Sequence, residues 1–394
     1  VSSARFRFLP KRLWLCLSLM NKPVGIYIHI PFCVKRCAYC DFYSGVGIDF
    51  ADTYEQALIR HISTYSGIRC DTVYFGGGTP TYFGAERLCR ILDAVKKSFD
   101  VCENAEITAE CNPKTASGTD FLLMKKHGFN RLSVGMQSAN EGELSALGRI
   151  HTAEDVKETV KAARRAGFDN ISLDVMYGIP CQTVNSFEKT IDFVLSMSPE
   201  HISAYMLKLE EGTPLFENAD KFTFPSEDDI VEMTRLTEQR LSDNGIERYE
   251  ISNYAKNGFE SRHNLKYWHR DEYISFGPSA SSFYDGRRYT YTLDIHLYTD
   301  YCFGKRDEKS VLSEEEFPDA NEAEAEYIML NLRLTKGVSK AEYEAFTGKK
   351  FDVCYGGKIK KYVALGLMTD GEFVRFTPQG FNVSNAVLSD ILEF

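Results

Sequence analysis

Three cysteines near the start of the chain have a spacing that suits an iron–sulfur cluster. Cys33, Cys37 and Cys40 lie in the segment YIHIPFCVKRCAYCDF and form a CxxxCxxC pattern. A structural zinc site would need a fourth ligand and more often uses paired CxxC knuckles, and a ferredoxin-like cubane also takes four thiolates. Three thiolates on one loop instead suit a [4Fe–4S] cluster whose fourth iron stays open to a small ligand. We therefore predict that these cysteines hold a [4Fe–4S] cluster.

Glycines and polar residues follow the next strand-like segments. The run Gly76–Pro80 reads GGGTP, and consecutive glycines let the backbone approach a ligand closely. Glu110, Gln137 and Asp174 lie at or near the ends of three later segments, and Arg149 follows in ALGRIH. Carboxylates can bind ribose hydroxyls or an ammonium, an amide can bind a nucleoside edge, and an arginine can bind a carboxylate. We expect these side chains to converge on one ligand.

The first strand-like segment places two aromatic rings on one face. Tyr27 and His29 alternate with Ile28 and Ile30, so both rings share a face of an extended strand. We expect Tyr27 to form a wall of the site. A single histidine on a strand is more often packed than a ligand, and that is our expectation for His29.

These residues belong to a regular alternation of strands and helices. Apolar, β-branched runs predict strands at Gly25–Ile30, Asp71–Phe75, Glu106–Cys111, Arg131–Gln137, Asn170–Met176 and His201–Lys208. Amphipathic segments predict helices at Asp49–Tyr65, Ala85–Phe99, Asp120–His127, Ala153–Ala166, Ser186–Met197 and Glu227–Asp243. Strands that alternate with helices predict βαβ units and an α/β fold with a parallel sheet. About six units suit an open doubly wound sheet or a partial barrel, and both bind ligands at the carboxyl ends of their strands.

The pattern changes after Gly245. The next segments predict strands at Glu247–Ala255, Tyr273–Phe276 and Ser281–Tyr284. An acidic run, Ser313–Glu326, leads into predicted helices at Glu322–Arg333, Ser339–Phe346 and Tyr355–Leu365, and a hairpin is predicted at Gly366–Thr377. Helices followed by a short hairpin resemble a winged-helix module. We therefore place a domain boundary near residue 310.

The composition is that of an ordinary globular protein with an unusual number of cysteines. The chain has 394 residues and a formal net charge of −10, with 43% hydrophobic and 26% charged residues. The acidic balance argues against a nonspecific binder of nucleic acid, because phosphate contacts need basic surface. Eleven cysteines, an odd number, favour a reducing compartment. No stretch approaches transmembrane length, so we predict a cytoplasmic protein without an integral membrane segment.

The N-terminal segment Val1–Met20 combines four basic side chains with a short apolar run. The run is too short to span a bilayer, and no small-residue cleavage site follows it. Met20 stands just before the first strand-like segment. We expect the native chain to begin there, which makes residues 1–20 a doubtful leader.

The cysteine loop and its flanks resemble the radical S-adenosylmethionine (SAM) enzymes. YIHIPFC, YFGGGTPT, SVGMQS, ALGRIH and LDVMYGIPCQT are together similar to the oxygen-independent coproporphyrinogen III oxidase family, from about residue 24 to the C-terminus. The resemblance implies that SAM chelates the open iron and that the reduced cluster releases a 5′-deoxyadenosyl radical from it. It assigns SAM contacts to Tyr27, Tyr39, Gly77, Gly78, Thr79, Glu110, Gln137, Arg149, Asp174 and Lys208. Of these, Gln137, Arg149 and Asp174 match residues that hold a second SAM in the decarboxylating members.

The resemblance also implies a division of the chain. Residues 21–245 form a partial (β/α)6 barrel with the [4Fe–4S] and SAM site. Residues 246–310 form a β-rich extension, and residues 311–394 form a small winged-helix-like α+β domain.

Two features are similar to the haem-chaperone (HemW-type) branch of this family. The decarboxylating oxidases carry a further cysteine two residues after the third, and this chain has Phe42 there. The branch also shows an HNxxYW motif associated with haem, present here as His263–Trp268. Imidazole can ligate haem iron, and Tyr and Trp can pack on a porphyrin. The resemblance thus implies haem binding by His263, Tyr267 and Trp268, whereas without it a surface histidine beside a core aromatic pair explains the motif better.

One stretch departs from the family pattern. Where a GxGAHS-like sequence is expected, Gly277–Ser282 reads GPSASS and lacks the histidine. Any role of that histidine is therefore in doubt for this chain.

Three functional hypotheses follow. The first is a haem chaperone that passes haem to an acceptor protein and takes electrons from a donor such as a flavodoxin or ferredoxin; peripheral contact with membrane-bound acceptors is left open. The second is an enzyme that oxidatively decarboxylates coproporphyrinogen III, which Phe42 disfavours, so no catalytic residue is assigned. The third makes the C-terminal module a nucleic-acid reader through Lys358, Lys360 and Lys361, which the acidic run and the net charge disfavour.

Overall fold

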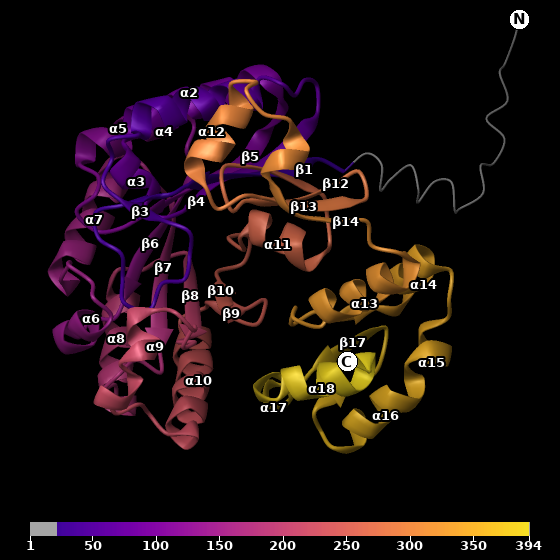
Figure 1. Ribbon diagram of the computed structural model, residues 1–394. Helices are drawn as coiled ribbons and strands as arrows, with labels where there is room; N and C mark the ends of the chain where they lie inside the picture. The colour runs from indigo at the N-terminus through magenta and orange to yellow at the C-terminus, as the bar shows by residue number, and fades with distance from the viewer. Residues whose placement is uncertain (1–21, 394) are drawn as a thin grey trace, which may run out of the picture.

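A single large sheet organises most of the molecule. The computed structural model describes residues 22–393, so the expected leader 1–20 lies outside the described residues. Six neighbouring parallel strands form the middle of the sheet, and Figure 1 shows them side by side with helices along their outer side. They are β1 (Val24–Ile30), β4 (Arg69–Gly77), β5 (Asp100–Cys111), β6 (Arg131–Gln137), β7 (Asn170–Tyr177) and β8 (His201–Met206). The predicted α/β fold, a partial (β/α)6 barrel, is confirmed.

Helices connect these strands on the outside of the sheet. They are α2 (Ala51–Ile62), α3 (Pro80–Phe83), α4 (Ala85–Ser98), α5 (Gly118–His127), α6 (Glu141–Ala146), α7 (Ala153–Arg165), α8 (Val184–Ser196) and α10 (Glu227–Ser242), with the short α9 (Pro214–Glu217) after β8. Capping boxes begin α5, α7 and α8, where the side chains of Ser117, Thr152 and Thr183 accept hydrogen bonds from the third residue of each helix. These caps satisfy backbone donors that the first helical turn leaves unpaired.

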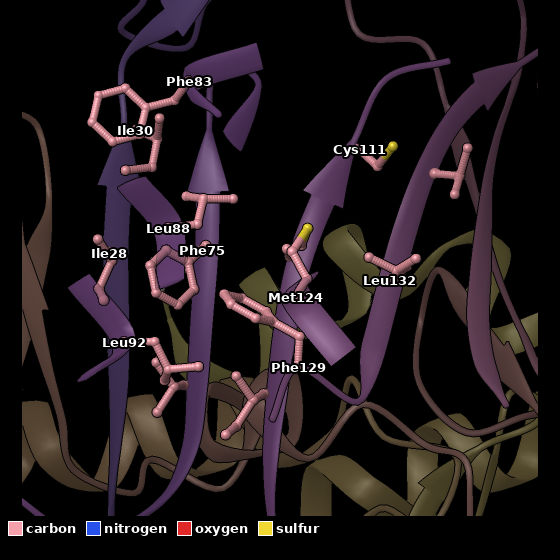
Figure 2. Packing of buried hydrophobic residues seen from close by; sticks show 14 of the residues in the cluster. Ile28, Ile30, Phe75, Phe83, Leu88, Leu92, Cys111, Met124, Phe129 and Leu132 are labelled. Atoms are coloured by element: carbon pink, nitrogen blue, oxygen red, sulfur yellow. The ribbon is translucent and has the colours of Figure 1, made fainter. Parts of the chain in front are cut away.

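The alternation of side chains along each strand separates the core from the site. Ile28 and Ile30 of β1 point toward the helices and are fully buried, and Figure 2 shows them near Phe75 of β4 and Leu88 and Leu92 of α4. Burying each such side chain stabilises the fold by about 1.5–3 kcal/mol. The intervening residues of the parallel strands therefore face the concave side of the sheet, where the pockets lie.

The residues after α10 extend the sheet at both of its edges. The short strands β9 (Glu247–Arg248) and β10 (Asn253–Ala255) continue from β8, and β11 (Tyr273–Phe276) pairs in parallel with β1. The strands β12 (Ser281–Tyr284), β13 (Arg287–Tyr291) and β14 (Leu312–Glu316) follow β11, and two helices, α11 (Arg262–Trp268) and α12 (Ile295–Cys302), lie between these strands in sequence. The expected β-rich extension 246–310 thus supplies edges of the main sheet.

The acidic run adopts a structure that the sequence did not predict. Glu314–Glu316 belong to β14, which pairs with β13, and Arg287 forms an ion pair with Glu315 at 2.7 Å. Arginines on the neighbouring strand compensate the carboxylates, so the segment extends the sheet instead of leading directly into a helix. The boundary placed near residue 310 therefore falls before the last strand of the main sheet.

The C-terminal part is a small α+β unit with a hydrophobic core of its own. Its helices are α13 (Ala320–Asn331), α14 (Lys340–Thr347), α15 (Phe351–Cys354), α16 (Gly356–Ala364), α17 (Pro378–Asn382) and α18 (Ser384–Leu392), and its strands are β15 (Val338–Ser339), β16 (Met368–Thr369) and β17 (Phe373–Phe376). Two of its lysines are engaged in ion pairs, Lys358 with Glu393 and Lys361 with Asp390. Within residues 22–393, no helix is both long and apolar enough to cross a membrane.

Candidate functional site

The CxxxCxxC loop is fixed at its ends and in its middle. The strand β2 (Phe32–Cys33) pairs with β3 (Gly45–Val46), which closes the loop at its base. At its centre, the Ala38 N–H donates to the carbonyl of Leu147 at 2.9 Å, and its carbonyl accepts from Leu215 N–H at 2.8 Å. The loop is therefore a positioned element at the carboxyl end of β1, where a parallel sheet binds its ligands.

The three thiols form no disulfide, and all three face one pocket. Cys33 is almost buried, whereas Cys37 and Cys40 are half-buried. Burial raises the pKa of the Cys40 thiol to about 11, an effect that metal binding opposes because a coordinated thiol loses its proton. In the described part of the chain, no three His, Cys, Asp or Glu side chains converge on a single metal ion. An iron–sulfur cubane does not require such convergence, because each thiolate binds a different iron.

A pocket of about 490 Å³, here called the first pocket, brings most of the predicted site together. It lies at the carboxyl ends of the parallel strands. Its lining includes Cys33, Cys37, Cys40, Tyr39, Gly77, Gly78, Thr79, Glu110, Gln137, Arg149, Asp174 and Lys208. Its volume lies within the range of about 300–1,000 Å³ that is usual for small-molecule sites.

Arg149 links the cysteine loop to the sheet. Its Nη1 donates to Cys37 Sγ at 3.4 Å, and its Nη2 donates to Asn112 Oδ1 at 2.8 Å and to the carbonyl of Gly135. Its Nε is buried and has no hydrogen-bond partner. Interaction with the neighbouring Tyr39 and Cys37 raises the pKa of the guanidinium even though burial opposes this, so the group stays charged. An anionic ligand group would meet a fixed positive charge here.

Glu110 is held against the glycine run. Its carboxylate accepts hydrogen bonds from Tyr74 Oη at 2.9 Å and from Gly77 N–H at 3.1 Å. Burial raises its pKa to about 7. Gly77 has a φ of 110°, and a Cβ at Gly78 would lie 2.8 Å from the Phe32 carbonyl. Both positions therefore need glycine so that the end of β4 can pass close to the cysteine loop.

Gln137 and Asp174 hold neighbouring positions on β6 and β7. Gln137 has a φ of 67°, and a bulge interrupts the pairing of the two strands beside it. Its Oε1 accepts a hydrogen bond from Tyr205 at 2.9 Å. A non-glycine residue in the left-handed region costs about 1–3 kcal/mol, and such strain is concentrated at functional sites. Asp174 accepts from Ser133 at 3.0 Å, and burial raises its pKa.

The remaining predicted SAM positions differ in exposure. Tyr39 is half-buried in the first pocket, while Lys208 lies at its rim with a side chain that is 76% exposed and paired with Glu210 at 2.6 Å. Tyr27 does not line the first pocket. It lines a neighbouring cavity, here called the second pocket, and its ring stacks on Tyr74 and His263.

Sequence reasoning missed several residues of the first pocket, among them Arg131, Ser133 and Tyr205. Arg131 is 2% exposed, and its Nε has no hydrogen-bond partner. The alternation along β6 and β8 could have found these residues, because Arg131 and Ser133 share the face of Gln137, while Ser203 and Tyr205 share a face of β8.

The HNxxYW motif lies on α11, whose inward face is saturated with bonds. His263 is 1% exposed, its Nδ1 is bonded to Thr72 Oγ1 at 2.8 Å and its Nε2 to Tyr267 Oη at 2.8 Å. Carboxylate oxygens of Glu106 accept hydrogen bonds from the Arg262 and His263 N–H groups, both at 3.1 Å, and Lys266 forms an ion pair with Asp71 at 2.7 Å.

This geometry bears on both predictions for the motif, which are a haem ligand and a surface histidine beside a core aromatic pair. His263 is not a surface residue, because it is 1% exposed, and this burial lowers its pKa to about 3. It is not an open ligand either, since both ring nitrogens are bonded within the protein. Trp268 is half-buried and lines neither the first pocket nor the second pocket.

Comparison with known proteins relates these sites to a family. Residues 27–194 match the model of the radical SAM superfamily, and residues 319–383 match the HemN C-terminal domain. "Heme chaperone HemW" of Bacillus subtilis is 34% identical over 379 residues, which cover 93% of this chain and 98% of that protein. The protein of the same name from Escherichia coli is 31% identical and covers 93% of this chain and 97% of its own length. The chain belongs to the HemW family of radical SAM proteins.

A solved structure shares the fold of this HemW-family chain. Coproporphyrinogen III oxidase (HemN) from Escherichia coli, described as a radical SAM enzyme, superposes with a TM-score of 0.81 at 21% identity. The match covers 97% of this chain and 93% of the oxidase. Because the identity is low, this likeness concerns the fold alone.

The residues present fit the cofactors of the radical SAM superfamily. Three free thiols share a pocket with two close-packed glycines that admit a ligand beside the backbone. The buried Arg149 Nε and Arg131 Nε lack partners at the wall of the same pocket. Such orphaned donors are rare in folded proteins, and a polar ligand or a water in the pocket would satisfy them. By contrast, both ring nitrogens of His263 in the HNxxYW motif are already bonded to protein groups, so neither is open to an iron.

The second pocket, of about 670 Å³, adjoins the first. The two share Arg36, Asp41, Phe42, Ser44, Gly77 and Glu110. Phe42 is 64% exposed and lines both pockets. Ser279 and Ser281 of the GPSASS stretch also line the second pocket, so the stretch that lacks the family histidine contributes to this wall.

Proposed function

We propose that this chain is a haem chaperone built on a radical SAM scaffold: it binds haem and passes it to an acceptor protein. The proposal rests on its similarity to "Heme chaperone HemW" from two bacteria over nearly the whole length of each chain. The observation in the site that supports it is Phe42, which places a phenyl ring where the decarboxylating relatives carry a cysteine. An apolar ring at the edge of a large pocket suits the planar, apolar face of a porphyrin.

Within this proposal, Cys33, Cys37 and Cys40 hold a [4Fe–4S] cluster, and the first pocket holds SAM. A cluster of this kind, when bound, supplies single electrons. Arg149 and Glu110 then bind the charged ends of SAM, and Gln137 and Asp174 bind its nucleoside part. Tyr39, Thr79 and Lys208 close the pocket around it. Tyr27 acts from the second pocket.

The proposal requires partner proteins. A haem-accepting protein takes the cargo, and a flavodoxin or ferredoxin type of donor reduces the cluster. Contact with a membrane-bound acceptor would be peripheral. The acidic net charge of −10 favours basic docking surfaces on these partners. The cytoplasm remains our prediction for the compartment, based on the cysteine usage of the sequence.

Haem titration followed by transfer tests the proposal. Reconstituted protein is titrated anaerobically with haemin and followed through the Soret band, and the loaded protein is then mixed with apomyoglobin as a haem sink. We expect saturable one-to-one binding and release to the sink. Absence of saturable binding would refute the chaperone function.

The alternative function is tested on the same preparation. The reduced protein is incubated with SAM and coproporphyrinogen III, with Cys33→Ser as background. We expect no decarboxylated product above that background, because the residue at position 42 is phenylalanine. Product formation would favour the oxidase.

A further inference from the structure

The second pocket has a volume and aromatic walls that suit a haem, and its lining also includes the carboxyl groups of Asp41 and Glu110. Its volume of about 670 Å³ lies in the usual range for cofactor-sized ligands. Phe42 and Leu293, 64% and 59% exposed, give it apolar edges. Arg36 lies at the boundary of the two pockets and is exposed, and the structure pairs it with no carboxylate among the described residues. A cavity with aromatic walls, apolar edges and a free guanidinium matches a planar macrocycle that carries carboxylates.

Histidine ligation is blocked in this pocket. His29 lines it, but the ring donates through Nε2 to the carbonyl of Tyr43 at 2.9 Å and is bonded through Nδ1 to Tyr27 Oη at 3.1 Å. His263 lies behind the wall with both nitrogens bonded. At the position of the family histidine, the pocket has Ser281. Within residues 22–393, no histidine therefore presents an unbonded ring nitrogen to this cavity.

The phenol groups of tyrosines line this pocket and can bind haem iron. One of them, Tyr267, has a histidine as its hydrogen-bond partner. Tyrosine is an established axial ligand of haem iron. Tyr267 lines the second pocket, and its phenol oxygen is bonded to His263 Nε2 at 2.8 Å. His263 is in turn fixed by Thr72, and the start of its helix is fixed by Glu106. An outer partner that orients a ligand atom in this way is a general feature of metal sites.

We propose that haem occupies the second pocket with the phenol oxygen of Tyr267 as its axial ligand, and that His263 is a positioning residue for that oxygen. The assignment rests on the proposed haem-binding function and reverses the roles that the HNxxYW motif suggests. Arg36 then pairs with a propionate at the mouth of the pocket, and Phe42 covers one edge of the ring. The first pocket keeps its own ligands, so haem and SAM bind side by side.

Spectroscopy of haemin-loaded variants tests the assignment. The reconstituted full chain is titrated with haemin, and its axial ligand is identified from resonance Raman and visible spectra. We expect an iron–phenolate signature in the native protein, because the phenol oxygen releases its proton to solvent when it binds the iron. Tyr267→Phe should remove this signature and weaken binding by roughly 100-fold, whereas His263→Gln, which can still bond the phenol, should keep the signature and weaken binding by about tenfold.

A matched control exists elsewhere in the barrel. Tyr249 Oη is bonded to His201 Nε2 at 2.9 Å and lines neither pocket. Tyr249→Phe removes the same kind of histidine–tyrosine bond, so it should destabilise the fold as Tyr267→Phe does but leave the haem spectrum unchanged. Thermal unfolding of each variant measures the shared structural effect.

The outcomes separate this assignment from the proposed function. A native protein that shows no saturable binding overturns both. A native protein with a histidine–iron signature that His263→Gln abolishes overturns the Tyr267 ligand and leaves the chaperone function standing. Loss of the phenolate signature in Tyr273→Phe but not in Tyr267→Phe has the same effect, because Tyr273 is a second phenol of the pocket.

Discussion

The cysteine loop and the HNxxYW helix carry the two strongest motifs of the chain, and the structure treats them in opposite ways. The three thiols form no disulfide, lie on a loop and face a pocket of about 490 Å³, with Thr79 as a hydrogen-bond partner of Cys33 and Arg149 as one of Cys37. The motif histidine is buried at 1% exposure, and both of its ring nitrogens are bonded. Both motifs indicate the family, but a motif alone does not show which of its atoms are available to a ligand.

Loss of the cluster should be the largest effect. Cys33→Ser removes one of three iron ligands from the loop, and we expect the reconstituted protein to lose its [4Fe–4S] cluster entirely. Iron and sulfide content and the visible absorption of the cluster measure this. Cys354→Ser, a change at an exposed cysteine of the C-terminal unit, is the control and should reconstitute fully. A normal cluster in Cys33→Ser would contradict the assignment.

Removal of the buried guanidinium should have the next largest effect. Arg149→Met leaves Asn112 Oδ1 and the Gly135 carbonyl without their donor. Truncating a buried, hydrogen-bonded charge costs about 2–5 kcal/mol, so SAM affinity should fall by roughly 100-fold or more. Calorimetric titration with SAM measures the change. The exposed pair residue Arg235 supplies the control Arg235→Met, and equal affinities in both variants would exclude Arg149 from the SAM site.

The free energy of unfolding should fall as pH rises through the range in which Glu110 ionises. The folded pKa is about 7 against an ordinary value of 4.5, with burial as the cause. Because the folded pKa is raised, the contribution is fully present below pH 4.5 and is lost by about pH 7. The loss is about 3 kcal/mol.

Denaturant unfolding of the cluster-free chain at pH 5 and pH 8 measures this difference. Glu110→Gln should flatten it, since the amide does not ionise. Asp174 on β7, Arg131 on β6 and Tyr74 on β4 also act on this carboxyl. An unchanged pH dependence in the variant would assign the effect to Asp174, whose pKa burial also raises, and not to Glu110.

A structural role of His263 predicts a moderate loss of stability. His263→Ala leaves the hydroxyls of Thr72 and Tyr267 without their partner in the interior. Each unsatisfied buried group costs about 1–3 kcal/mol, so we expect a total loss of about 2–6 kcal/mol in the free energy of unfolding. Chemical denaturation of the haem-free chain measures it. A variant as stable as the native chain would show that the histidine is free to bind a ligand.

Phe42 should contribute the smallest effect. Its ring is 64% exposed without haem, so it gains burial only when a macrocycle covers it. Phe42→Ser should therefore weaken haemin binding by about fivefold, about 1 kcal/mol, from lost apolar contact. Cluster content should stay unchanged in the same sample. A lost cluster would mean that Phe42 supports the cysteine loop and not the haem pocket.

The amino-acid sequence determined the elements and the family. Apolar, β-branched runs marked all six parallel strands, and amphipathic periods marked the longer helices between them, because those patterns follow from which parts of each element are buried. Strand-end positions such as Glu110, Gln137 and Asp174 were predictable, since parallel strands present their carboxyl ends at one edge. The spacing of Cys33, Cys37 and Cys40 was predictable because it is local.

The tertiary structure alone decided what the local patterns could not. Arg131 and Tyr205 belong to the first pocket because β7 pairs with both β6 and β8 and so brings these two strands to one part of the sheet. Glu314–Glu316 form a strand because Arg287 lies on the partner strand. His263 is saturated because Thr72, 191 residues earlier in the sequence, lies behind it. Availability of an atom is a property of its neighbours in space, and those neighbours come from distant parts of the chain.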